Sequence, residues 1–162
     1  MSDLMNYEKL AELEKNAYSR VYRGYDHAGD RSVRIIEFHA SLASDPARWD
    51  QIWAEVVSAA GTNQQNTVSV YAVLREPRWV VTEWLDANLG ELLPRRRMSP
   101  DEVRNVLRQG LRALQRWHER GKLHGDVRPA TLLFHDGDFI KLNYSPGLEL
   151  GGQVLLPERG LK

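Results

Sequence analysis

The segment Ser99-Pro100-Asp101-Glu102 marks the start of a long helix more sharply than any other local signal in the chain. A serine N-cap and a glutamate three residues later bond to backbone N–H groups that the first turn of a helix leaves unpaired, and proline suits the first helical position. Apolar residues then recur at helical spacing up to Gly121, which we expect to close the helix. They form one stripe, made of Val103, Val106, Leu107, Leu111, Leu114 and Trp117.

The first part of the chain alternates between apolar and polar residues, as antiparallel strands do. Val21 and Tyr22 precede the polar, glycine-containing turn 26–30, and residues 32–38 resume the extended pattern. Two such runs around a short turn are typical of a β-hairpin.

A helix is expected to follow this hairpin. Asp45 is a good N-cap, Pro46 suits the first helical position, and Gly61 is a natural end. The apolar residues between them follow the helical period: Trp49, Ile52, Trp53, Val56, Val57 and Ala60. Two further strands, 68–73 and 79–84, should complete a sheet whose half-buried face packs against this helix.

The last part of the chain predicts a second hairpin and an irregular tail. The apolar run 131–134 and the strand 139–142 flank the turn 135–138. Beyond them, glycines and prolines predict irregular structure. We expect two parts, a strand-rich part over residues 1–84 and a mainly helical part over residues 85–162.

Composition excludes several classes of function. The 22 basic and 22 acidic residues balance, so no net charge favours nucleic acid or an anionic membrane. The chain has no cysteine, and its five histidines lack metal-ligand spacing, so we expect no metal site. Neither a secretion signal nor an apolar run long enough to cross a membrane is apparent, and a cytoplasmic protein without membrane insertion is expected.

Three blocks of sequence resemble the protein kinase family. Residues 114–129, with His124-Gly125-Asp126 at their centre, are similar to helix E and the His-Arg-Asp catalytic loop. Residues 66–71 resemble the strand after helix C, and residues 81–85 resemble the hinge, with Thr82 at the gatekeeper position. The resemblance covers about residues 7–158 in the family's order.

This resemblance implies an α+β fold. The N-lobe would contain a five-stranded antiparallel sheet and one helix, helix C. The C-lobe would contain helices D and E, the catalytic loop, a hairpin and a short activation segment that ends at Leu156-Pro157-Glu158. Helices F to I would be absent, so the chain is expected to be either naturally minimal or a piece of a longer protein.

The family's nucleotide-binding residues are replaced in this sequence. The three glycines of the phosphate-covering loop align with Glu14, Asn16 and Ser19, whose side chains would crowd a nucleotide. The phosphate-binding lysine aligns with Ile36. Its glutamate partner on helix C aligns with Glu55, and Arg34 is a candidate partner for that glutamate.

Arg34 itself replaces a small alanine that lies against the adenine ring in the family. Its long guanidinium side chain could fill the nucleotide pocket, pair with a nearby acid, or point to solvent. The sequence leaves these three arrangements open, and a compensating contact with phosphate is the least favoured use of the side chain.

The metal ligands implied by the resemblance are also replaced. The loop asparagine aligns with Thr131, and the aspartate of the Asp-Phe-Gly triplet aligns with Tyr144. A hydroxyl and a phenol are poor ligands for Mg²⁺. Asp126 keeps the position of the catalytic base, and we interpret it as an acceptor for backbone N–H groups that organises the loop. No cofactor is expected.

The leading hypothesis is a catalytically inactive pseudokinase that serves as a protein-binding or scaffolding module. One alternative is an atypical serine/threonine kinase or nucleotide-binding domain, and another is a structural remnant of a larger signalling protein. Without helix F, the apolar stripe is expected to be exposed and to support a protein contact, most simply a homodimer. The interaction candidates are Val103, Leu107, Leu111 and Leu114.

Overall fold

The computed structural model describes residues 6–15, 19–41, 45–60, 65–121, 123–135, 137–143, 149–150 and 153–154. At residues 48, 55, 58–60, 149–150 and 153–154 it describes only the backbone. The chain divides into two compact units. One contains residues 1–63 and 69–84, and the other contains residues 64–68 and 85–162. The sequence predicted a single division at residue 84. The structure instead assigns residues 64–68 to the second unit, because the backbone of this segment is hydrogen-bonded there. Leu142 N donates to Asn66 O (2.8 Å) and Val68 N donates to Leu142 O (3.0 Å).

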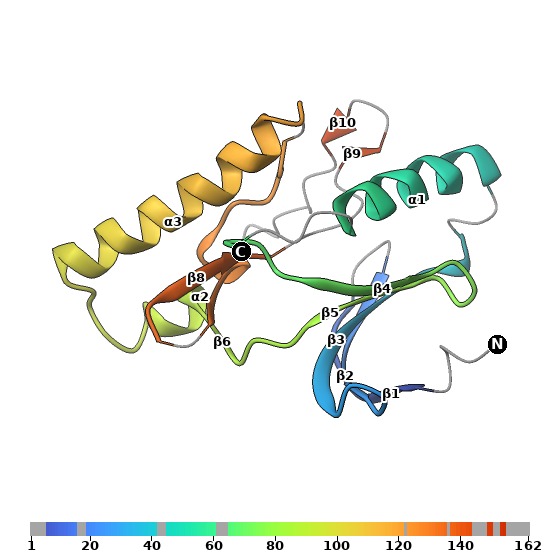
Figure 1. Ribbon diagram of the computed structural model, residues 1–162, viewed down its shortest axis with the longest axis horizontal. Coiled ribbons are helices and arrows are strands. Elements are labelled where there is room, and N and C mark those ends of the chain that lie inside the picture. Colours follow the sequence, from blue (N-terminus) through green and yellow to red (C-terminus); the bar gives the residue numbers. More distant parts are fainter. Residues whose placement is uncertain are drawn as a thin grey trace, which may run out of the picture. The chain divides into compact units, whose positions relative to one another are not determined.

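The first unit is a five-stranded antiparallel sheet with one helix, as predicted (Figure 1). The strands run in the order β1-β2-β3-β5-β4, and the helix lies between the third and fourth strands in sequence. The expected hairpin is formed by β2 and β3, and the helix begins at Pro46 after Asp45, while Gly61 lies outside the described residues. The elements are β1 (Tyr7–Lys15), β2 (Ser19–Asp26), β3 (Arg31–Phe38), α1 (Pro46–Ala60), β4 (Val70–Leu74) and β5 (Trp79–Glu83).

Both faces of this sheet carry apolar side chains. On one face Phe38 meets Trp49 of α1 edge to face, with ring centroids 5.6 Å apart. On the other face Val33, Ile35 and Val81 form a buried cluster, against which aromatic side chains pack. The central strand β3 therefore has buried residues on both faces, Val33 and Ile35 on one and Ile36 and Phe38 on the other.

The second unit places a long helix beside a small sheet. The Ser99 capping box is present as predicted: Glu102 N donates to Ser99 Oγ (3.2 Å), and Ser99 N donates to Glu102 Oε2 (2.7 Å). Arg96 also forms two bonds to the Glu102 carboxylate, at 3.0 and 2.7 Å, and with Ser99 lowers the pKa of Glu102 to about 2. The elements are β6 (Ala87–Asn88), α2 (Leu89–Leu92), α3 (Pro100–His118), β7 (Leu132–His135), β8 (Phe139–Leu142), β9 (Glu149–Leu150) and β10 (Gln153–Val154).

Three details differ from the sequence-based expectation. The predicted hairpin is β7–β8, but β6 adds a third strand beside β7. Thr131 belongs to a 3-10 turn (Pro129–Thr131) rather than to a strand. The tail was expected to be irregular, yet β9 and β10 pair as two short antiparallel strands. Among the described residues, no helix is long and apolar enough to cross a membrane.

Only part of the apolar stripe on α3 lies on the buried face of that helix, because Val106 is buried while Leu114 and Trp117 are half-buried. Val106, Gln109 and Ala113 are its buried residues, and Val106 belongs to a core cluster with Leu89 and Ile140. The residues Val103, Leu107 and Leu111 are 41%, 59% and 64% exposed. The hydrophobic repeat alone could not reveal this, because a glutamine occupies the centre of the buried face.

Gln109 is the centre of a buried amide network. Its Oε1 accepts from Asn66 Nδ2 (3.0 Å) and Ile140 N (2.9 Å), and its Nε2 donates to Asp138 O (2.8 Å). Asn66 Nδ2 also donates to Ile140 O (2.8 Å). The network joins α3, the β7–β8 hairpin and the segment 64–68.

We expect Q109L to lower the free energy of unfolding by about 2 kcal/mol, because it leaves buried amide groups without partners. Q115L makes the same substitution at an exposed position of α3 and should change stability little. Urea unfolding followed by circular dichroism measures both variants. Equal stability of the two would show that the network contributes nothing.

Candidate nucleotide-binding positions and catalytic loop

The strands β1 to β3 carry the positions that align with the family's nucleotide-binding residues. Glu14 is exposed near the end of β1, and Ser19 is buried at the start of β2, opposite Phe38 of β3. Asn16 lies outside the described residues. Two of the three positions expected for glycine therefore carry ordered side chains in the sheet.

Ile36, at the position expected for the phosphate-binding lysine, is buried. It is 3% exposed and pairs in register with Val21 of β2 and Val80 of β5. A hydrocarbon side chain in this setting supplies neither charge nor a hydrogen bond to a phosphate. Glu55 is in α1, but its side chain lies outside the described residues, so its expected pairing with Arg34 stays a prediction.

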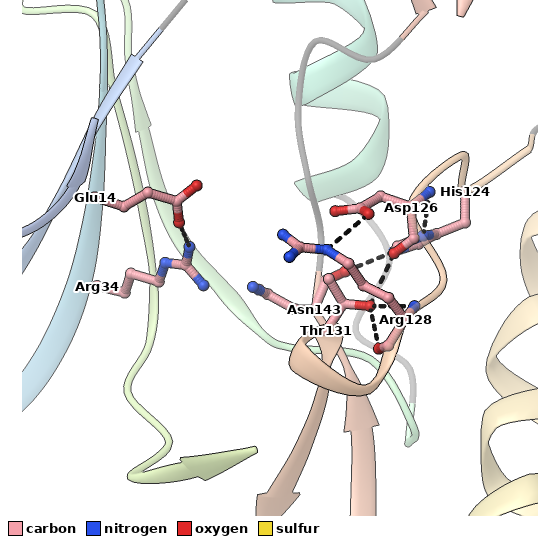
Figure 2. Close-up of polar contacts among 7 residues, drawn as sticks. All are labelled: Glu14, Arg34, His124, Asp126, Arg128, Thr131 and Asn143. Atoms are coloured by element: carbon pink, nitrogen blue, oxygen red, sulfur yellow. Dashed lines mark hydrogen bonds and ion pairs between the residues drawn. The ribbon is translucent and has the colours of Figure 1, made fainter. Parts of the chain in front are cut away.

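Arg34 forms an ion pair with Glu14, and Figure 2 shows the two side chains pointing toward each other. The distance between Arg34 Nη2 and Glu14 Oε2 is 3.9 Å, and the side chains are 22% and 51% exposed. Of the three arrangements left open by the sequence, this contact supports pairing with an acid. Such a solvent-exposed pair adds little stability, about 0–1 kcal/mol. Its significance is that two replaced positions of the site interact with each other.

Thr82, the residue at the expected gatekeeper position, is fully buried in β5. It lies opposite Arg34 of β3, and its hydroxyl donates to Glu83 O (3.3 Å). Thr82 is thus in the interior of the sheet, and its strand partner is the arginine that pairs with Glu14.

In the second unit, Asp126 is paired with a side chain rather than with the backbone donors that we expected. Arg128 Nε donates to Asp126 Oδ1 at 2.9 Å, and the side chain of Asp126 is 16% exposed (Figure 2). The arginine lies two residues after the aspartate, where an extended backbone brings the two side chains together. This contact neutralises the one acidic group that keeps its position in the loop.

Thr131, which aligns with a metal-binding asparagine, holds the catalytic loop together. It is 4% exposed, and its hydroxyl donates to Asp126 O (2.8 Å) and accepts from Arg128 N (3.1 Å). Its own carbonyl accepts from Asn143 N (2.8 Å). The hydroxyl is therefore engaged by the loop backbone. Tyr144, the other replaced metal ligand, lies outside the described residues.

His124 is a buried part of the same loop. Its Nε2 donates to Asn143 O (2.6 Å), its Nδ1 accepts from Asp126 N (3.3 Å), and its ring meets Trp117 edge to face. Burial lowers the pKa of His124 below its ordinary value, although the bond to Asn143 and the nearby Asp126 charge oppose that shift. The ring is therefore held in its neutral form.

Sequence reasoning missed the structural roles of Arg128 and Asn143. The charge of Arg128 two residues from Asp126 was a usable signal for their pairing. Asn143 had no comparable signal, because its contacts to His124 and Thr131 are made by backbone atoms, which any residue would supply. Among the described residues, no group of three histidine, aspartate or glutamate side chains could hold a metal ion.

Comparison with known proteins agrees with this architecture. Residues 7–143 match the protein kinase domain family, and the chain belongs to that family. It is 33% identical over 140 residues to the serine/threonine-protein kinase PknL of Mycobacterium bovis. It is 28% identical to the human NUAK family SNF1-like kinase 1 over 140 residues, and 28% identical to the probable serine/threonine-protein kinase SCO3848 of Streptomyces coelicolor over 144 residues.

These alignments cover 84% of this chain but a much smaller share of the relatives. They span 35% of the PknL sequence and 21% of each of the other two. What is shared is therefore a part of the kinase domain, and its described residues comprise the five-stranded sheet, helices α1 to α3 and the loop around Asp126.

The buried His124 predicts a pH-dependent contribution to stability. Because its pKa is lowered on folding, the unfolded chain takes up a proton more readily as the pH falls below the ordinary histidine value of about 6.5. The stability advantage of the native chain over H124Q should therefore shrink between about pH 7 and about pH 5. H118Q, which replaces an exposed histidine, should keep the native pH dependence. A constant difference between the native chain and H124Q across that range would contradict this assignment.

The position of Arg34 predicts that R34A admits an adenine ring. Removing the guanidinium restores the small residue that the family has there, so weak, roughly millimolar binding of adenosine should appear in NMR titrations. R23A removes the arginine opposite Arg34 in register and should not gain this binding. If R34A binds adenosine no better than the native chain, Arg34 is not what excludes the ring.

Proposed function

We propose that this protein kinase family member is catalytically inactive and acts as a protein-binding module. The observation that carries the proposal is Ile36, a buried hydrocarbon side chain at the position aligned with the phosphate-binding lysine. Phosphoryl transfer depends on positioning and on neutralising phosphate charge, and a residue without charge or donor does neither.

The surrounding residues support the same conclusion. Glu14 brings a carboxylate to a position expected for a phosphate-covering glycine, and it forms an ion pair with Arg34. In the catalytic loop, the Thr131 hydroxyl is bonded to backbone and the Asp126 carboxylate to Arg128. In each unit, taken by itself, the polar groups at these positions are therefore used for internal contacts.

An atypical serine/threonine kinase is the second candidate. Asp126 keeps the position of the family's catalytic base, and the relatives carry the names of serine/threonine kinases. In such a kinase a substrate hydroxyl would have to displace Arg128 from Asp126, and the nucleotide would need a substitute for the lysine. Binding of Mg²⁺–ATP distinguishes this candidate from the inactive module.

A binding role requires a surface, and α3 offers one. Val103, Leu107 and Leu111 are exposed, while Leu114, the fourth interaction candidate, is half-buried. A contiguous apolar surface on a folded protein is typical of an interaction site. The homodimer expected from the sequence stays a prediction.

We expect no change in melting temperature when Mg²⁺–ATP is added to the chain. A ligand at about 100 times its dissociation constant would add about 2.7 kcal/mol of stability, which a thermal shift readily detects. The kinase domain of a serine/threonine relative, measured in parallel, should be stabilised. A Mg²⁺-dependent rise in the melting temperature of this chain would instead support the atypical kinase.

A further inference from the structure

The exposed side of α3 carries two parallel rows of side chains. The first row is apolar, with Val103, Leu107 and Leu111 spaced four residues apart and 41% to 64% exposed. The second row is basic, with Arg104, Arg108 and Arg112 at the same spacing. Since an α-helix rises about 1.5 Å per residue, each row is about 12 Å long. A shallow depression on the helix surface is lined by the basic row, the two leucines of the apolar row and Gln115.

The charges of the basic row are largely uncompensated. Arg104 Nη1 forms an ion pair with Asp101 Oδ1 (2.7 Å). Arg108 donates to the neutral amide oxygen of Asn105 (3.0 Å), and among the described residues no ion pair involves Arg108 or Arg112. Two guanidinium groups thus lie beside exposed leucines and are available to carboxylates of a partner.

We propose that this surface binds an acidic amphipathic helix of a partner protein. This inference rests on the proposed binding function and specifies the chemistry of the partner. Rows of side chains four residues apart are the ridges through which two helices commonly pack. A partner helix with an apolar residue at every fourth position and a neighbouring row of Asp or Glu matches both rows at once.

Charge favours such a partner over a second copy of this chain. In a symmetric dimer the same patch meets itself, so each copy would bring three arginines and one aspartate, Asp101, to the contact. The like charges would oppose association. A lipid surface fits less well, because membrane binding grows with the apolar area that is buried, and this row offers only three side chains, each partly covered by the fold.

The probe for this proposal is a fluorescein-labelled synthetic helical peptide of about four turns, with leucine at every fourth position and a flanking row of glutamate. A matched peptide has lysine in place of each glutamate. We expect the glutamate peptide to raise fluorescence anisotropy on binding the full chain, and the lysine peptide to bind weakly. R108E/R112E should weaken binding of the glutamate peptide about tenfold and should strengthen binding of the lysine peptide.

Two further variants complete the test. L107S/L111S should abolish binding of the glutamate peptide. Circular dichroism of this variant should show an unchanged fold, because both leucines are exposed. R95E/R97E makes the same charge change at exposed arginines before α3 and should leave binding nearly unchanged. Added salt should weaken the complex, because exposed charges are screened.

The proposal is overturned if the glutamate peptide does not bind, or if R108E/R112E binds it as well as the native chain does. Light scattering that shows a dimer lost in L111E would assign the surface to a second copy. Binding to phosphatidylserine vesicles but not to the peptide would assign it to a membrane. None of these outcomes changes the Mg²⁺–ATP result, so the two proposals fail separately.

Discussion

The hydrogen bonds of Gln109 determine how the second unit is assembled. A glutamine in the middle of a helix face has to bury its amide, and this is favourable only when its donors and acceptors find partners. Here the partners are Asn66, Ile140 and Asp138, which belong to segments far apart in the sequence. These bonds hold α3 against the hairpin and, through β8, place Asn143 next to the catalytic loop. His124 and Thr131 then bond to the backbone of Asn143.

The loop and the sheet illustrate two ways in which a nucleotide site can be replaced. In the loop, Thr131 and Arg128 occupy the polar groups that would otherwise face a metal or substrate, and the loop keeps its order through its own hydrogen bonds. In the sheet, the position expected for the lysine holds Ile36, whose side chain is part of the hydrophobic core. Glu14 and Arg34 form an ion pair and so compensate each other's charge. The fold can tolerate such replacements, because packing and catalysis depend on different residues.

The placement of α3 also explains why an apolar row is exposed on this helix. The helix has a narrow buried face, Val106, Gln109 and Ala113, and the leucines beside it are left in solvent. Exposed leucines are costly only in proportion to the apolar area that water contacts, and a partner that covers them recovers that free energy. The neighbouring arginines limit which partners can do so, since a charged row must be matched as well as covered.

The sequence by itself determined the secondary structure and the family. The capping box at Ser99, the Asp45-Pro46 helix start and the two hairpins are local signals, set by backbone bonding and by the repeat of apolar residues. The three kinase-like blocks, taken together in the family's order, identified a protein kinase relative, and the resemblance made the replaced residues visible. The tertiary structure decided which side of α3 is buried, which acid pairs with Arg34 and which group holds Asp126. The first two outcomes depend on residues brought together from distant parts of the chain, whereas Arg128 lies only two residues from Asp126. Hydrophobic periodicity cannot show that a glutamine with three hydrogen-bond partners from distant segments, rather than a leucine, occupies the centre of a helix's buried face.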